Sequence, residues 1–179
     1  TAHTLSLHDA LPISILPHRL FLLGTFFFPQ CNVELIIKDK ASTCIFTWRD
    51  DSFGNKGWHL PGGIIRPNES YLNRVKEVLW SEIPEVAELI ESRYSLHCLG
   101  ISEVIKTKPS YRSHFISLVF LLKVNFEIES SEINKKHILL SKNKPKDLIK
   151  NHPRYGRLVE MDVEELSKNC LMNIPDKNQ

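Results

Sequence analysis

GWHLPGG at residues 57–63 is followed by Glu69 and by a run of helical pattern that ends at Ser81-Glu82-Ile83. The stretch predicts a strand, a tight double-glycine turn and a helix that presents a carboxylate near its end. A backbone carbonyl at the turn and a carboxylate on the helix are hard oxygen ligands, which a small divalent cation prefers. The pattern therefore predicts a magnesium-assisted site for a diphosphate.

Composition and charge are those of one ordinary domain. The 179 residues with 42% apolar content are enough for a single core. A formal net charge of +2 gives no extended basic surface, so nucleic acid is not expected as a partner. The lysines between residues 135 and 150 are interpreted as a solvated loop rather than a phosphate-steering surface. The four scattered cysteines lack a spacing for zinc or a disulfide framework, which predicts the reducing cytoplasm.

The N-terminal region divides into two segments with different interpretations. The apolar run at residues 20–28 is too short to span a bilayer and is stopped by Pro29, so no membrane association is expected. Residues 1–14 lack an initiator Met and are similar to translated sequencing-adaptor sequence, so they are interpreted as a non-native leader. The predicted domain covers residues 15–170, and residues 171–179 are a C-terminal tail.

Apolar periodicity predicts strands that alternate with helices. Helices are predicted over residues 20–27, 68–83 and 163–168, the second with Asn68 as its N-cap and Pro84 at its end. Strands are predicted over residues 33–37, 44–48, 96–105, 115–124 and 157–160. The first two form a hairpin, and residues 115–124 are apolar enough to lie centrally in a sheet. Residues 127–150 are predicted to be a long polar loop with at most a short helical turn.

The spacing of Gly63, Glu69 and Glu82 resembles the Nudix box. In that box, Gly is followed by five residues, Glu, seven residues, Arg-Glu, an apolar residue, any residue, Glu-Glu, any residue and Gly. Leu79 fits the apolar position. The positions that differ are Glu77 in place of Arg, Val78 and Ser81 in place of Glu, and Pro84 in place of the closing Gly.

The missing carboxylates follow a pattern that resembles the GDP-mannose mannosyl hydrolase branch of the Nudix superfamily, which keeps only the acid that corresponds to Glu82. The likeness covers roughly residues 15–170 and includes Trp58, Pro61 and the pair Asn151-His152. It implies an α/β/α sandwich with a mixed sheet, the box helix on one side and the C-terminal helix on the other. It also implies a homodimer formed through the N-terminal region.

The resemblance implies that water attacks the anomeric carbon of a nucleotide sugar, which releases a nucleoside diphosphate and free sugar with inversion. Mg²⁺, with Mn²⁺ as an alternative, would be held by the Gly62 carbonyl, Glu82 and the side-chain oxygen of Asn151. Val78 cannot accept a proton, so His152 is the predicted base. Arg49 would stabilise the leaving group, and Glu34 would contact the substrate where the branch has Asp.

Departures from the branch leave other functions open. Ile64 and Glu77 stand where arginines are usual, and Phe115 stands where a tyrosine is usual. One alternative is a Nudix pyrophosphohydrolase that cleaves between the phosphates of a nucleoside diphosphate derivative. Another is a catalytically degenerate Nudix module that only binds a nucleotide or a protein. The plain structural interpretations are a turn for Gly62-Gly63, a solvated helix carboxylate for Glu82 and a surface histidine for His152.

Overall fold

A computed structural model describes residues 18–50, 56–90, 93–105, 113–130, 133, 136–148 and 155–168. The helices are α1 (His18–Phe27), α2 (Tyr71–Glu82), α3 (Pro84–Ile90), α4 (Gly156–Glu160) and α5 (Val163–Lys168). The strands are β1 (Gln30–Lys38), β2 (Cys44–Asp50), β3 (Lys56–His59), β4 (Gly62–Ile64), β5 (Tyr94–Ile105), β6 (His114–Val124) and β7 (Ile138–Ser141).

The strands form a mixed seven-stranded sheet with the order β3-β2-β1-β6-β5, to which β4 is added beside β1 and β7 beside β2. The long pairing of β1 with β6 is parallel and runs from Gln30↔Phe115 to Lys38↔Lys123. The other strand pairs are antiparallel. The predicted internal position of residues 115–124 is confirmed, because β6 lies between β1 and β5.

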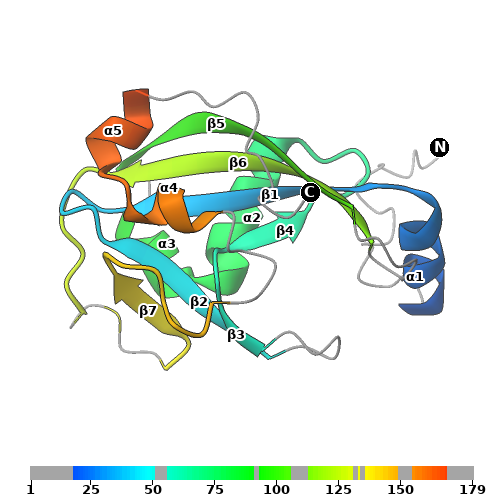
Figure 1. Cartoon of the computed structure of the whole chain (residues 1–179), viewed down its shortest axis with the longest axis horizontal. Coiled ribbons are helices and arrows are strands. Elements are labelled where there is room, and N and C mark those ends of the chain that lie inside the picture. The colour runs from blue at the N-terminus through cyan, green and yellow to red at the C-terminus, as the bar shows by residue number, and fades with distance from the viewer. Residues whose placement is uncertain are drawn as a thin grey trace, which may run out of the picture.

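Helices cover both faces of this sheet (Figure 1). Alternate residues of β1 point to opposite faces, as the period of two requires. Val33, Leu35 and Ile37 pack with α2 and α3, whereas Ile36 packs with apolar residues of α4 and α5. The predicted α/β/α sandwich is confirmed, with α2 on one side and the C-terminal helices on the other.

The helix α2 begins later than the sequence indicated. Its N-cap is Ser70, whose hydroxyl accepts a hydrogen bond from the Asn73 amide at 3.1 Å. The prediction of Asn68 as the cap is wrong, because this residue has φ 62° in the turn before the helix. Pro84 follows the end of α2 as predicted, and it also begins α3, since proline is well suited to a first helical position.

Two other predictions of local structure are wrong. Residues 157–160 were expected to be a strand, but they belong to α4, where the Met161 amide bonds the Arg157 carbonyl at 3.1 Å. Residues 138–141 were expected to lie in a loop, but they form β7 and pair with β2 from Thr47↔Ile138 to Cys44↔Ser141. Both segments are so short that their sequence pattern cannot distinguish strand, helix and loop without their distant partners.

The buried Lys38 connects the β1 end of the sheet to the C-terminal helices. Its ammonium group donates to the carbonyls of Val159 at 2.6 Å, Met161 at 2.7 Å and Ser42 at 3.2 Å. A cation at the end of α4 also interacts favourably with the carbonyls that the helix leaves unpaired. Burial lowers the pKa of this lysine, and the nearby Cys44 and acidic groups oppose that shift.

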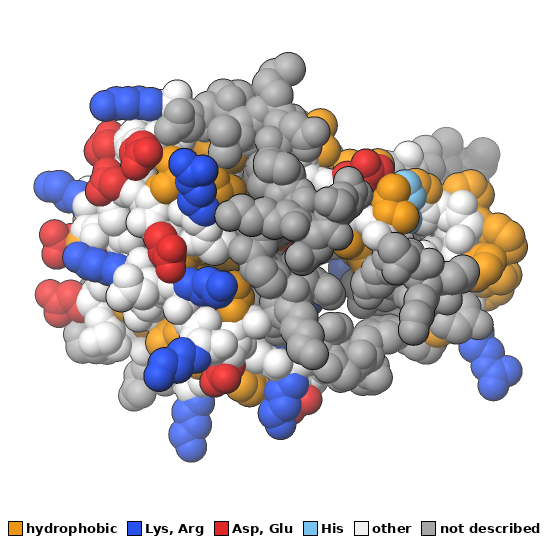
Figure 2. Space-filling view, in the orientation of Figure 1, with side chains coloured by type: hydrophobic (Ala, Val, Ile, Leu, Met, Phe, Trp, Pro, Cys, Tyr) orange, Lys and Arg blue, Asp and Glu red, His pale blue; other side chains and the backbone are white. Residues whose placement is uncertain are grey.

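Apolar side chains are exposed at the end of the molecule where α1 lies. Leu20, Leu23 and Phe27 of this helix are exposed, as is Phe28, and Figure 2 shows hydrophobic side chains gathered there. None of the described helices has the length and apolarity that crossing a membrane would require. Cys31, Cys44 and Cys98 carry free thiols, whereas Cys170 lies outside the described residues.

Candidate active site

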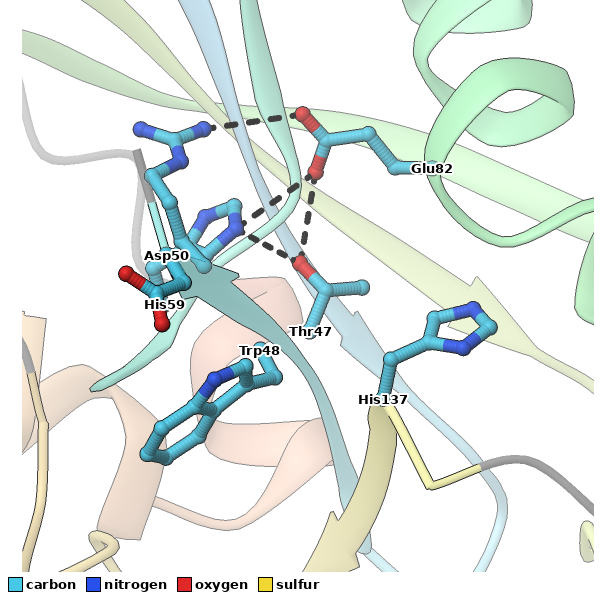
Figure 3. Close-up of a pocket in the computed structure, with 7 residues that line it drawn as sticks. Thr47, Trp48, Asp50, His59, Glu82 and His137 are labelled. Atoms are coloured by element: carbon cyan, nitrogen blue, oxygen red, sulfur yellow. Dashed lines mark hydrogen bonds and ion pairs between the residues drawn. The ribbon is translucent and has the colours of Figure 1, made fainter. Parts of the chain in front are cut away.

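The carboxylate of Glu82 lies at the end of α2 and points into a pocket of about 270 Å³ (Figure 3). The Arg49 Nη2 atom lies 3.6 Å from Glu82 Oε1. The Thr47 hydroxyl lies 3.3 Å from Glu82 Oε2, and His59 Nε2 lies 3.9 Å from the same oxygen. The residues that line the pocket come from β2, β3, α2 and the segment before β7: Thr47, Trp48, Arg49, Asp50, His59, Glu82 and His137.

Burial raises the pKa of the Glu82 carboxyl to about 7. The Arg49 charge, the Thr47 hydroxyl and the Gly62 backbone N–H favour the ionised form and oppose this effect, but they do not offset it. A carboxyl group whose pKa is raised by desolvation, and which lies beside an arginine in a pocket, has the properties of an active-site residue. The plain interpretation of Glu82 as a solvated helix residue does not fit this environment.

His59 and Thr47 had no predicted role in the site. They are cross-strand partners on β3 and β2, with Thr47 Oγ1 2.9 Å from His59 Nε2. The other ring nitrogen, Nδ1, lies 2.6 Å from the Leu60 carbonyl oxygen, which can only accept, so Nδ1 carries a hydrogen. This bond fixes the ring with Nε2 directed toward Thr47 and Glu82. The sequence signal would have been the register of the β2–β3 pair, which local pattern does not reveal.

The glycine pair was predicted to form a tight turn. This prediction is wrong, because both glycines belong to β4. Gly62 pairs with Glu34, and Gly63 pairs with Val33. A Cβ atom on Gly62 would lie 2.7 Å from the Val33 carbonyl oxygen, and one on Gly63 would lie 3.0 Å from a methyl group of Val78. Glycine is therefore needed because β4 lies directly against β1 on one side and α2 on the other.

The box positions without a carboxylate have structural roles in this chain. Val78 is 1% exposed and packs in the core, where an ionised side chain would be costly. The Ser81 hydroxyl donates to the Glu77 carbonyl of its own helix. Glu82 is thus the box acid that reaches the pocket, while the other matching acid, Glu69, forms a two-point ion pair with the buried Arg74 at 2.6 and 2.9 Å.

The predicted site residues are only partly brought together. Arg49 and Glu82 meet in the pocket, and the Gly62 amide reaches the Glu82 carboxylate. Glu34 is not among the lining residues; it lies on the α4 and α5 face, where Oε1 accepts a hydrogen bond from the Asn32 amide at 3.1 Å. Asn151 and His152 lie outside the described residues, so their roles stay predictions.

The donor atoms in this pocket are compatible with one hard cation. Magnesium usually keeps several waters and takes one or two protein carboxylates together with substrate phosphates. Glu82 offers such a carboxylate, and a cation would compensate its costly ionised form at neutral pH. Within the described residues, no group of three or more His, Cys, Asp or Glu side chains is placed to hold a metal ion.

Comparison with solved structures identifies the fold. A bifunctional NMN adenylyltransferase/ADP ribose pyrophosphatase from Francisella tularensis, complexed with AMP and manganese, has a TM-score of 0.50 and 18% identity over 83% of this chain and 45% of its own. The MutT protein from Methanosarcina mazei Go1 has a TM-score of 0.48 and 20% identity over 78% of this chain and 94% of its own. The fold is Nudix-type.

The Nudix domain of NrtR from Shewanella oneidensis, complexed with ADP ribose, has a TM-score of 0.45 and 12% identity over 64% of this chain and 73% of its own. No protein-family model and no curated protein sequence matches the chain. These likenesses to Nudix structures concern the fold alone.

Proposed function

We propose that the chain is a Mg²⁺-dependent hydrolase of the Nudix superfamily that converts a nucleotide sugar, GDP-mannose or a related GDP-hexose, to GDP and free sugar. The observation that carries this proposal is the half-buried carboxylate of Glu82, which lies beside Arg49 in a pocket to which positions 78 and 81 bring no carboxylate. Most Nudix enzymes direct water to phosphorus and use a box glutamate as base, and this chain has Val78 at the position of that glutamate.

In the proposed reaction, a water oxygen bonds to the anomeric carbon while the bond from that carbon to the diphosphate oxygen breaks. The leaving diphosphate takes the electron pair, and His152 takes the proton of the attacking water. Arg49 stabilises the negative charge that develops on the leaving group. A magnesium ion held by Glu82, the Gly62 carbonyl and Asn151 would supply further charge stabilisation to the diphosphate, and Mn²⁺ is an alternative.

Two contacts in the described residues support a common site for these groups. The Gly62 N–H bonds the Glu82 carboxylate, so the strand that offers the proposed carbonyl lies against the end of α2. The described chain before Asn151 ends at Leu148, which pairs with Trp58, the neighbour of His59. Leu148 therefore lies beside the strand that carries the pocket histidine.

Hydrolysis between phosphates is the second candidate. It is favoured by the likeness in fold to a bifunctional NMN adenylyltransferase/ADP ribose pyrophosphatase. Its products would be a nucleoside monophosphate and a sugar phosphate. The third candidate, a nucleotide-binding module without activity, predicts binding without turnover.

The proposed protein is a homodimer, because the exposed apolar face of α1 offers a surface for a second copy. Its proposed location is the cytoplasm.

Product analysis in ¹⁸O-labelled water tests the reaction directly. The protein is incubated with a panel of nucleotide sugars in magnesium and separately in manganese. We expect GDP and a free hexose that carries the label. Label in a phosphate product would instead support the pyrophosphohydrolase, and no product from any substrate would support the binding module. Arg49→Lys serves as the matched variant, and we expect it to retain binding but to lose about 100-fold in kcat.

A further inference from the structure

A row of polar side chains crosses the sheet on the face that α4 and α5 share. Asn32 of β1 pairs with Ser117 of β6, and Ser117 pairs with Ser102 of β5. Glu34 follows Asn32 by two residues, so it lies on the same face, and their side chains are in contact. We call Glu34, Asn32, Ser117 and Ser102 the polar floor.

The polar floor differs from the rest of this sheet face. Toward the other end of the same strands, Ile36, Leu121 and Leu99 pack with Tyr155 and with the apolar residues of α4 and α5. A face that served only for packing would continue this apolar pattern, because each buried polar group costs free energy unless it is paired. Asn32, Ser117 and Ser102 are nevertheless buried.

Hydrogen bonding satisfies only part of the polar floor. Asn32 Nδ2 donates to Ser117 Oγ at 2.9 Å and to Glu34 Oε1 at 3.1 Å. Asn32 Oδ1 and Ser102 Oγ find no partner within the part of the chain that the structure describes. The two side chains are 8% and 0% exposed, so water does not solvate them freely. Unpaired buried polar atoms destabilise a fold, and such exceptions call for a functional explanation.

The polar floor also reaches the strand of the candidate active site. Glu34 pairs with Gly62, and its Oε2 atom would lie 2.9 Å from a Cβ atom placed on that glycine. The amide of the same glycine bonds Glu82. One glycine thus has the polar floor on one side and the pocket carboxylate on the other.

We propose that the polar floor binds an edge of the substrate that is rich in hydrogen-bond donors; this inference rests on the proposed nucleotide-sugar function. The amide oxygen of Asn32 and the carboxylate of Glu34 can only accept hydrogen bonds, and the Ser102 hydroxyl can accept and donate. Donor-rich edges of a GDP-hexose are the hydroxyl groups of the sugar and the N–H edge of guanine. Asn32 and Ser117 act in addition as positioning residues, because they fix the Glu34 carboxylate.

Ser102→Ala is the sharpest test, because it removes a hydroxyl that has no partner among the described residues and should not weaken the fold. Binding of GDP-mannose and of GDP is measured by calorimetry with calcium in place of magnesium, beside Asn32→Ala and the control Ser167→Ala. The control hydroxyl bonds the Val163 carbonyl within α5, away from the polar floor. We expect Ser102→Ala and Asn32→Ala each to raise the Kd for GDP-mannose about 3- to 10-fold, as the loss of one hydrogen bond does. Ser167→Ala should leave the Kd unchanged, and Ser102→Ala should melt at or above the wild-type temperature.

Comparison of GDP-mannose with GDP shows whether the polar floor binds the sugar hydroxyls or the N–H edge of guanine. A rise in Kd for GDP-mannose alone assigns the polar floor to the sugar, and an equal rise for GDP assigns it to the base. Wild-type binding and turnover with unchanged Kd in both floor variants would overturn the role of the polar floor and leave the reaction standing. Wild-type binding without turnover would overturn the proposed reaction alone, and no binding by the wild type would overturn both.

Discussion

At the scale of single residues, the carboxyl group of Glu82 destabilises the folded chain when it is ionised. Its carboxyl has a folded pKa of about 7 against an ordinary value of 4.5, so the folded chain holds this proton more tightly than the unfolded chain. Stability is therefore unaffected by this group below pH 4.5, falls as the pH rises toward 7, and stays lowered above it. The full cost at pH 8 is on the order of 3 kcal/mol.

Glu82→Gln should remove this dependence on pH. In urea unfolding with EDTA, we expect the wild type to lose stability between pH 5 and pH 8 by more than Glu82→Gln does. Added magnesium should recover part of the loss in the wild type and none in the variant, because the cation compensates the buried charge. The control is Glu88→Gln, whose side chain is exposed on α3. Identical pH profiles for the wild type and Glu82→Gln would contradict the raised pKa.

The residues of the site show how far a local pattern predicts chemistry. The resemblance to the Nudix box singled out Glu82, and the structure places its carboxylate in the pocket. Arg49 was selected by the resemblance to the mannosyl hydrolase branch, and its Nη2 atom lies 3.6 Å from Glu82 Oε1. Thr47 and His59 were missed because their partnership depends on the register of two strands. The Glu69–Arg74 ion pair was missed as well, since Arg74 stands three positions before the usual box arginine.

At the scale of elements, the close approach of β4 to β1 predicts a strong effect of Gly62→Ala. The new methyl group would lie 2.7 Å from the Val33 carbonyl oxygen, and neither backbone can move without disturbing the β1–β4 pairing. We expect a loss of about 1 to 3 kcal/mol in the free energy of unfolding. Gly24→Ala is the matched control, because a Cβ atom there meets nothing within 4 Å. It lies within α1, so it should be neutral or stabilise by up to about 1 kcal/mol.

Lys38 predicts a second effect at this scale, on the docking of α4 and α5. Lys38→Met should leave the carbonyls of Val159 and Met161 without their donor while it keeps most of the side-chain volume. We expect a destabilisation of about 1 to 3 kcal/mol, measured by urea unfolding, with earlier proteolysis of the C-terminal helices. The exposed Lys40 provides the control variant Lys40→Met. Equal stability of the two variants would show that the three-carbonyl contact does not hold these helices.

Elements with a strong period of their own were predicted from sequence, and those that depend on partners were not. In β1, β5, β6 and α2, the apolar residues follow a period over runs long enough to identify each element as a strand or a helix. The five residues of α4 and the four of β7 do not, and they acquire their structure from Lys38 and from the edge of β2. The glycine pair was expected to be a turn, but it is a strand because it pairs with β1, and its neighbours in β1 and α2 leave little room for a Cβ atom.

At the scale of the whole molecule, the apolar face of α1 predicts self-association. Leu23 is 50% exposed and Phe27 is 64% exposed, and they lie four residues apart on one side of the helix. If the chain forms the proposed homodimer through this face, Leu23→Glu and Phe27→Glu should give monomers in light scattering after size exclusion. Leu72→Glu is the control, because this α2 residue has a similar exposure of 48%. A wild-type monomer at micromolar concentration would contradict the proposal.

The parallel pairing of β1 with β6 has a consequence for how the chain reaches this structure. The side-chain contact between Asn32 and Ser117 joins positions 85 residues apart. During synthesis, β1 therefore emerges from the ribosome long before β6 has been made. Until then, the apolar residues that β1 buries in the folded protein are exposed to solvent. Contacts of such long range slow folding and expose nascent strands to aggregation. Recovery of soluble protein should thus depend on chaperone supply and on growth at low temperature more than the size of the domain would suggest.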